Sequence, residues 1–176
     1  MQRLPRIAMS ASLLVLLTQA GCLFDTRDPV PGGGEACFEP NNRATFGEVF
    51  ENLDESLQCL DATVYLDGFA DDFEYVPASG GVVQPWGKDE EERFINELVA
   101  SGATIVADSR SGDVNPPSGT TVVLVEASYS FLVNGIEYTG EAFYTLEAFA
   151  GSFQITRWEE KASANPLAVL RGDLVQ

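Results

Sequence analysis

Apolar side chains recur every three or four residues in the first half of the chain, which is the spacing of amphipathic helices. A capping box that begins at Thr45 precedes the first such stretch and predicts a helix over about 45–58. Asp61 can cap a second, shorter helix. A third helix is expected to start at Asp89 and to end at Gly102, since glycine favours the left-handed conformation that closes many helices.

The second half of the chain alternates apolar and polar residues, which predicts β-strands. Strands are expected at 104–108, 120–133 and 152–160, and a short one at 73–76 separates the second and third helices. Asn134-Gly135 is the favoured two-residue hairpin turn, because both residues tolerate the positive φ angles of a type I′ turn. The strand that follows this turn is therefore expected to fold back on the one before it.

The hairpin turn also fixes which residues lie opposite each other. Val125 is expected to face Tyr144 and Tyr129 to face Gly140, and the other pairs on that side are also apolar, aromatic or glycine. That side of the hairpin is therefore predicted to be buried. The opposite side mixes glutamate, serine and threonine with a few apolar residues and is only partly apolar.

A second tight turn pairs the last strand with the preceding one. With a regular register, Arg157 lies beside Tyr144 and Glu159 beside Ala142 on the buried face, while Trp158 lies on the other face. This arrangement would put two ionisable side chains next to a buried tyrosine.

The start of the chain has the features of an export signal. Arg3 and Arg6 form a positive start, an apolar stretch follows over 7–18, and small residues precede Cys22. About a dozen apolar residues are too few for a bilayer core that needs roughly 20, so a permanent transmembrane anchor is the weaker interpretation. We therefore expect residues 1–21 to be a signal peptide.

Ala20-Gly21-Cys22 resembles the lipobox of bacterial lipoproteins, in which the cysteine is lipidated and becomes the first residue after cleavage. Gln19 departs from that pattern, which usually has an aliphatic residue there, and an ordinary signal peptide with an incidental cysteine is the alternative. Leu23 stands where an aspartate is associated with inner-membrane retention. The resemblance implies that lipidated Cys22 anchors the protein in the outer membrane of a bacterial cell envelope, facing the periplasm or the cell surface.

Residues 22–36 are expected to be the lipidated cysteine and a flexible tether, because they contain prolines and three successive glycines and show no apolar period. The folded part is then 37–176, about 140 residues, a length that suits a single hydrophobic core. The tail after Asn165 is apolar enough to pack back on this domain.

Composition narrows the classes of function. The chain has 27 acidic and 10 basic residues and no histidine, and 45% of its residues are hydrophobic. Loss of residues 1–21 would remove two arginines and change the formal charge from −17 to about −19. Such a surface repels nucleic acid, and the lack of histidine removes the commonest general base and the commonest zinc ligand. We predict no nucleic-acid partner, no metal and no cofactor.

The acidic residues admit two interpretations. A cationic partner or calcium is one, and a solubilising coat is the other, which we favour. Asp89–Glu92 is the densest acidic run, and acids in the first turn of a helix complement its dipole. No stretch of the sequence has the aspartate spacing of a calcium-binding loop.

Cys37 and Cys59 stand just before the first predicted helix and near its end. In an oxidising envelope they suggest a disulfide that closes a loop of about 22 residues. A straight helix would hold its two ends about 20 Å apart, so the bond requires a bend between the cysteines. Two unpaired thiols are the alternative.

The predicted elements, in the order helix, helix, short strand, helix and long strands, carry a family resemblance. Its residues are Phe46–Leu57, Tyr65, Phe69, Asp71-Asp72-Phe73 and Phe153–Glu159. They resemble the nuclear-transport-factor-2-like superfamily, which includes SnoaL-like and cystatin-like proteins. The resemblance implies an α+β fold whose N-terminal helices pack in the concave face of a curved antiparallel sheet, as a cone with an apolar pocket, and a homodimer through the outer sheet face. Another helix-on-sheet sandwich is the rival architecture.

Enzymes of this superfamily place an aspartate, histidine or tyrosine inside the cone, and histidine is absent here. Proton transfer would then fall to a carboxylate whose pKa is raised by burial, with a tyrosine as partner. The candidates are Glu159 with Tyr144, supported by Arg157, and Tyr65 or Asp72 at the mouth of the cone. The alternative is that Arg157 and Glu159 neutralise each other at the rim while Tyr144 belongs to the core.

The sequence is therefore interpreted as a non-catalytic binding module of the cell envelope, for a small apolar ligand or an envelope protein. The residues expected to contact the ligand are Tyr65, Tyr129, Tyr144 and Arg157. A small lyase or isomerase that uses Glu159 and Tyr144 in the cone is the alternative function.

Overall fold

The computed structural model describes residues 37–78, 85–111, 119–161 and 166–175. The expected signal peptide and tether, Cys22 included, lie outside these residues. The helices and strands follow one another as α1 (Phe46–Cys59), α2 (Ala62–Asp67), β1 (Phe69–Val76), α3 (Lys88–Ser101), β2 (Ile105–Ser111), β3 (Val122–Val133), β4 (Ile136–Phe149), β5 (Ser152–Glu160) and α4 (Leu167–Leu174).

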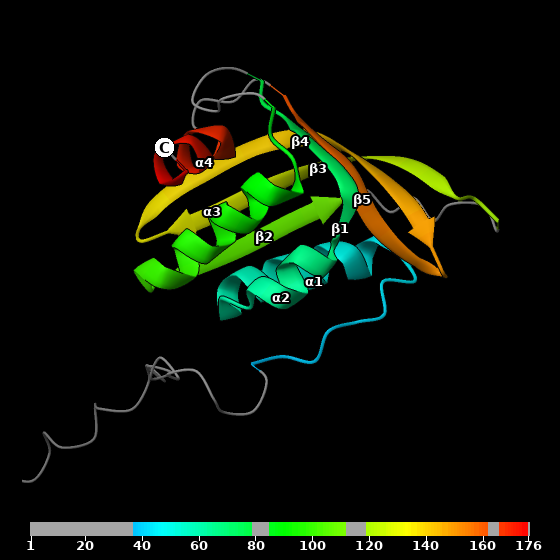
Figure 1. Ribbon diagram of the computed structural model, residues 1–176, viewed down its shortest axis with the longest axis horizontal. Helices are drawn as coiled ribbons and strands as arrows, with labels where there is room; N and C mark the ends of the chain where they lie inside the picture. The colour runs from blue at the N-terminus through cyan, green and yellow to red at the C-terminus, as the bar shows by residue number, and fades with distance from the viewer. Residues whose placement is uncertain (1–36, 79–84, 112–118, 162–165, 176) are drawn as a thin grey trace, which may run out of the picture. The chain divides into compact units, whose positions relative to one another are not determined.

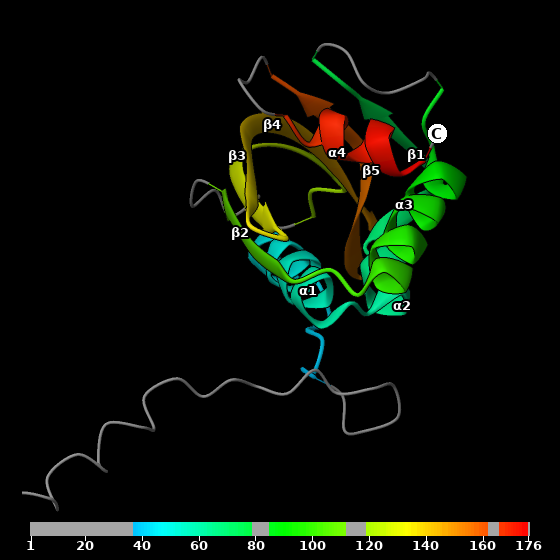
Figure 2. The same ribbon diagram turned by 90° about the vertical axis from the view of Figure 1, so that its left-hand side faces the viewer.

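The strands form one curved, open sheet in the order β1-β5-β4-β3-β2. Its concave side holds the helices, as Figures 1 and 2 show, so the predicted α+β arrangement is confirmed. The sheet is mixed, because β1 pairs with β5 in parallel while the other neighbours are antiparallel. The sheet is antiparallel as expected except at β1: most of the domain joins β1 to β5, which gives the chain room for a parallel crossover.

The helices begin and end close to the residues that the sequence predicts. Thr45 caps α1 through its side-chain oxygen, which accepts a hydrogen bond from the backbone N–H of Glu48. Asp61 caps α2 in the same way. α3 ends at Gly102, whose φ of 62° is the left-handed conformation that closes the helix. The capping residues therefore set the lengths of these helices.

The β3–β4 hairpin has the predicted register along its whole length. Val125 pairs with Tyr144, and Tyr129 pairs with Gly140. Val125, Tyr129 and Tyr144 all point to the concave side and are 5%, 2% and 0% exposed. Glycine is required at position 140, since a Cβ atom there would lie 2.5 Å from the hydroxyl oxygen of Tyr129.

The β4–β5 pair departs from the predicted register part-way along. Ile155 lies opposite Leu146 as expected, but the next pair is Arg157 with Thr145, which leaves Thr156 as an extra residue in β5. This β-bulge exchanges the two faces of β5 beyond it. Trp158 consequently lies opposite Tyr144 on the concave side. The predicted placement of Arg157 and Glu159 on the buried face is wrong for this reason.

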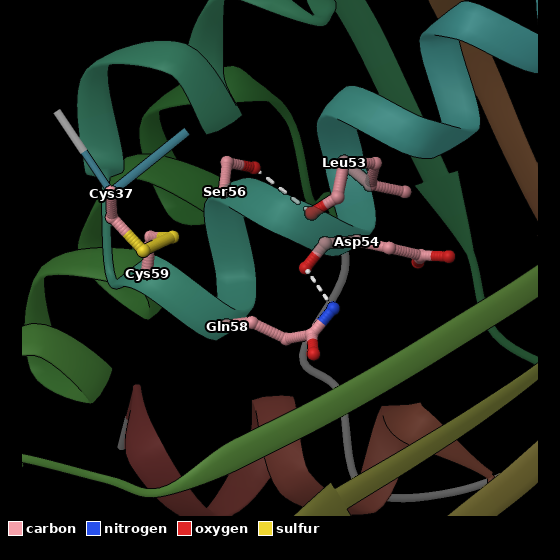
Figure 3. The surroundings of a disulfide bond; sticks show 6 residues. All are labelled: Cys37, Leu53, Asp54, Ser56, Gln58 and Cys59. Carbon is pink, nitrogen blue, oxygen red and sulfur yellow. Dashed lines mark hydrogen bonds between the residues drawn. A yellow bond between two sulfur atoms is a disulfide. The ribbon is translucent and has the colours of Figure 1, made fainter. Parts of the chain in front are cut away.

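The disulfide between Cys37 and Cys59 is present, with the two Cα atoms 5.8 Å apart (Figure 3). The chain before α1 folds back along the helix, which brings Cys37 to the far end of α1. Asn52, in the middle of α1, holds this segment: its side chain accepts from the backbone N–H of Asn41 and donates to the carbonyl of Asn41, both at 2.8 Å. The bend that the bond requires therefore lies before the helix.

Candidate functional site

A buried ion pair joins α4 to α3 inside the curved sheet. Arg171 of α4 and Glu91 of α3 are both 0% exposed. The guanidinium donates from Nε to one carboxylate oxygen at 3.0 Å and from Nη2 to the other at 2.6 Å. Figure 2 shows α4 lying between β4 and α3 at the end of the sheet's concave side. Arg171 thus fills the place where the resemblance implied a pocket.

Aromatic rings surround the guanidinium of Arg171. Its central carbon lies 4.1 Å from the ring centre of Tyr75 and 4.2 Å from that of Trp158. The ring of Phe94 is 5.3 Å away. A guanidinium at such distances is attracted by the negative faces of the rings, and the attraction is stronger where water is excluded. We call Glu91, Tyr75, Phe94 and Trp158 the guanidinium cage.

Two further side chains hold the carboxylate of Glu91. Trp86 donates from its indole N–H to Oε2 at 2.7 Å, and the hydroxyl of Tyr65 donates a short hydrogen bond to Oε1. Together with Arg171, they give each oxygen two donors, which uses the hydrogen-bonding capacity of a carboxylate. Glu91 therefore has no lone pair left with which to accept a proton from a substrate.

A second polar contact fixes the start of α4. The hydroxyl of Tyr129 donates to Glu160 at 2.7 Å and accepts from the backbone N–H of Leu167 at 3.2 Å. Both side chains are buried. α4 is thus held at its first residue by Tyr129 and near its end by Glu91.

The surroundings keep the Arg171 guanidinium charged and the buried tyrosines neutral. Burial lowers the pKa of Arg171 and is the largest single influence, but the charge and hydrogen bonds of Glu91, together with Tyr75 and Tyr65, raise this pKa well above its usual value. Burial raises the pKa of Tyr65, Tyr129 and Tyr144, so these phenols stay protonated at neutral pH. The arrangement suits firm binding of a cation better than proton transfer.

Little free space remains beside α4. The small cavity there has a volume of about 10 Å³. That is roughly enough for one water molecule and far below the 300 Å³ or more of typical small-molecule sites. Its lining is apolar and comes from α1, α3, the sheet and α4: Leu57, Tyr65, Phe94, Leu98, Ile105, Phe131, Val133, Leu167 and Leu170.

The structure brings only some of the predicted site residues together. Tyr65, Tyr129 and Tyr144 are buried on the concave side. Arg157 and Glu159 lie on the outer side beyond the bulge, where they form an ion pair at 3.2 Å, and Arg157 also bonds Glu74 of β1. The expected group of Glu159, Arg157 and Tyr144 is therefore not formed, because the sheet separates its members. Asp72 is exposed on β1.

The sequence pattern does not mark seven of the site's residues as functional: Tyr75, Trp86, Glu91, Phe94, Trp158, Glu160 and Arg171. Glu91 belongs to the acidic run 89–92, whose pattern indicates a solvated first turn of a helix. Its spacing could have placed it inside, since positions 91, 94, 95 and 98 form one stripe of α3 and the last three are apolar. Arg171 stands one helical turn after Leu167, in a tail whose apolar character was the only signal. The contact between the two is tertiary and left no local motif.

No helix among the described residues is long and apolar enough to cross a membrane. Within those residues, no three cysteine, aspartate or glutamate side chains come together as a metal site.

No protein-family model and no curated protein sequence matches the chain. Solved structures do match. A protein from Novosphingobium aromaticivorans, provisionally named an aromatic ring hydroxylase, has a TM-score of 0.57 at 11% identity, over 73% of this chain and 96% of that one. An NTF-2 like protein of unknown function from Shewanella oneidensis has a TM-score of 0.55 at 12% identity, over 66% and 96%. This chain has the nuclear-transport-factor-2-like fold.

A conserved protein from Planctomyces limnophilus is similar to the same extent, with a TM-score of 0.55 at 17% identity, over 65% of this chain and 90% of that one. Such low identities establish the nuclear-transport-factor-2-like fold and nothing about activity, since one fold carries many functions. The function of this domain has to come from its own residues.

Proposed function

We propose that the chain is a cell-envelope lipoprotein whose nuclear-transport-factor-2-like domain is a non-catalytic binding module for an envelope protein. The observation that carries the proposal is Arg171, which occupies the interior of the curved sheet. With α4 in place, the cavity that the described residues line there is too small for an apolar small molecule. A partner of the protein with α4 in place would then bind on the outer surface of the domain.

The chemistry of the interior supports a role without catalysis. Glu91 accepts four hydrogen bonds, and Glu160 is bonded to Tyr129 beneath α4. A general base must reach the proton that it removes, directly or through one water. Both carboxylates are enclosed by protein, so neither meets this condition in the closed domain.

The outer face of the sheet offers a surface for a protein partner. None of the described helices covers β2, β3 and β4 on this side. Val106, Leu124 and Leu132 are exposed there by 52%, 68% and 40%, and Val106 is paired directly with Leu132. Exposed apolar residues grouped on one face often mark an interaction site. A homodimer through this face is one form that the partnership can take.

The envelope location rests on the pattern of the first 36 residues. A positive start, an apolar stretch and Ala20-Gly21-Cys22 support lipidation of Cys22, and the glycine-rich segment supports a tether. Acyl chains anchor a protein because each buried methylene contributes about 0.8 kcal/mol. Cys22→Ala is expected to abolish labelling by a radioactive fatty acid and to move the protein from the membrane to the soluble fraction. Unchanged labelling would contradict the anchor.

Photo-crosslinking in the cells that make the protein tests the partner. A photoreactive amino acid at Leu124, on the outer face, is expected to give a discrete adduct of higher mass. The same amino acid at Glu97, an exposed position of α3, is the matched control and should give none. An adduct with a second copy identifies a homodimer. No adduct from Leu124, together with saturable binding of the apolar dye N-phenylnaphthylamine by the purified protein, would contradict the proposal.

A further inference from the structure

The guanidinium cage is built entirely by the body of the domain, whereas its occupant comes from α4. Tyr75 lies on β1, Trp158 on β5, and Glu91 and Phe94 on α3. Trp86 and Tyr65 hold the carboxylate of Glu91 in place without help from α4. Arg171 is the single buried cation among the described residues, and an eight-residue helix brings it in. The cage thus has the composition of a preformed receptor site.

We propose that the guanidinium cage is a binding site for alkylguanidinium groups, which Arg171 occupies as an intramolecular ligand. The ligand class includes small guanidinium compounds and the arginine side chain of another protein. This inference does not depend on a partner at the outer face, since it concerns the opposite side of the sheet.

The geometry selects a guanidinium over an ammonium ion. Rings of Tyr75 and Trp158 both lie within about 4 Å of the central carbon, which suits a flat, weakly hydrated cation. Glu91 meets two N–H groups with two oxygens, a fork that an ammonium ion cannot match. A primary ammonium would lose its strong hydration and could not present two parallel, coplanar N–H groups to the two oxygens.

Closure of the sheet does not by itself require an arginine. Leu167, Ala168 and Leu170 already supply the apolar packing of α4. Burying an ion pair adds little to stability compared with apolar residues of similar volume, because both charges lose their hydration. The body nevertheless holds the Glu91 carboxylate with Trp86 and Tyr65, next to the three rings that face the guanidinium. Such a site is explained by recognition of a cation.

Because Arg171 occupies the guanidinium cage, it competes with any free alkylguanidinium for this site. A tethered ligand acts at an effective concentration of the order of millimolar or more. A free alkylguanidinium is therefore expected to bind the wild-type protein at least tenfold more weakly than a variant whose own guanidinium is missing.

The test uses the purified Arg171→Ala protein and propylguanidinium as the probe. Propylguanidinium is expected to raise the thermal midpoint of this variant saturably and to change its tryptophan fluorescence, since Trp158 lies against the cage. The wild-type protein should show no saturation over the same range. N-acetyl-arginine amide separates the two ligand sources: rescue by this compound as well extends the site to arginine side chains, and rescue by propylguanidinium alone restricts it to small compounds.

Two controls make the result specific. Propylammonium at the same concentration should not rescue Arg171→Ala, and propylguanidinium should not rescue the double variant Glu91→Gln, Arg171→Ala. If Arg171→Ala does not fold alone, the yield of folded protein after refolding with propylguanidinium is the readout, compared with propylammonium. Equal rescue by both cations, rescue of the double variant, or no rescue at all would overturn the inference.

Discussion

Arg171 and Glu91 form a two-pronged ion pair from which water is excluded on every side, with both side chains 0% exposed. Removing one partner leaves an uncompensated buried charge, which typically costs about 3–5 kcal/mol. Arg171→Met and Glu91→Gln are each expected to lower the free energy of unfolding by about this amount.

A double-mutant cycle on this pair, measured by urea denaturation, checks the interaction. The double variant should lose clearly less stability than the two single variants added together, because the second change removes the stranded charge left by the first. Arg110→Met is the matched control, since Arg110 pairs with Asp108 on the surface, and it should leave stability unchanged within error. Additive single effects would show that the two residues do not interact.

Gly140→Ala is expected to destabilise the domain by about 1–3 kcal/mol. The added methyl group would lie 2.5 Å from the hydroxyl oxygen of Tyr129. Tyr129 cannot move aside freely, because it is 2% exposed and bonded to Glu160 and Leu167. Thermal unfolding measures the loss. Ser128→Ala, on the exposed side of β3, is the control, and an equal, small effect of both changes would argue against the close contact.

Asp54 should make stability depend on pH. Burial raises its pKa from 3.8 to about 6, although hydrogen bonds from Ser109 at 2.5 and 2.7 Å oppose the rise. The folded state then binds more protons than the unfolded state between these two values, so stability falls as pH rises through this window. The loss is about 3 kcal/mol, from 1.36 kcal/mol per unit of pKa shift.

Denaturation of the wild type and Asp54→Asn between pH 3 and 7 measures this effect. The variant cannot ionise at position 54, so its stability relative to the wild type is expected to increase by about 3 kcal/mol as pH rises across the window. A difference that stays constant with pH, or that moves in the opposite direction, would contradict the burial of a protonated Asp54.

The Cys37–Cys59 bond closes a loop with a sequence separation of 22. Restricting an unfolded loop of this length stabilises the folded state by about 3 kcal/mol. The double variant Cys37→Ala, Cys59→Ala is therefore expected to unfold at lower urea concentration, and the reduced wild type should match it. Equal stability with and without the disulfide would contradict this prediction. It would mean that the unfolded segment between the cysteines gains little conformational freedom when the disulfide is absent.

Local signals in the sequence were sufficient for most of the fold. Thr45 and Asp61 are helix caps whose chemistry acts within three residues, and Asn134-Gly135 determines the whole β3–β4 register. These features were predictable because the residues that cause them are neighbours in the chain. The bend before α1 was predictable only in part. The disulfide requires a bend between Cys37 and Cys59, but no local signal shows where in that segment it lies.

The site was not predictable in the same way. The extra residue Thr156 turns Trp158 inward and Glu159 outward. From the sequence alone, either Arg157 or Trp158 could lie on the buried face of β5, because the two residues are adjacent and alternate residues of a strand face opposite sides. Arg171 meets Glu91 across a separation of 80 residues. A charged residue in an apolar tail and one in an acidic helix turn each have an ordinary local explanation, so only the folded chain relates them.

Nuclear magnetic resonance of the arginine side chains tests the central claim, that Arg171 lies stacked inside the closed sheet. The account predicts that the Nε proton of Arg171 exchanges with solvent far more slowly than that of exposed Arg110, and that its side-chain protons are shifted upfield by the rings of Tyr75 and Trp158. Exchange as fast as that of Arg110, without ring-current shifts, would show that Arg171 is in water and that the guanidinium cage is empty.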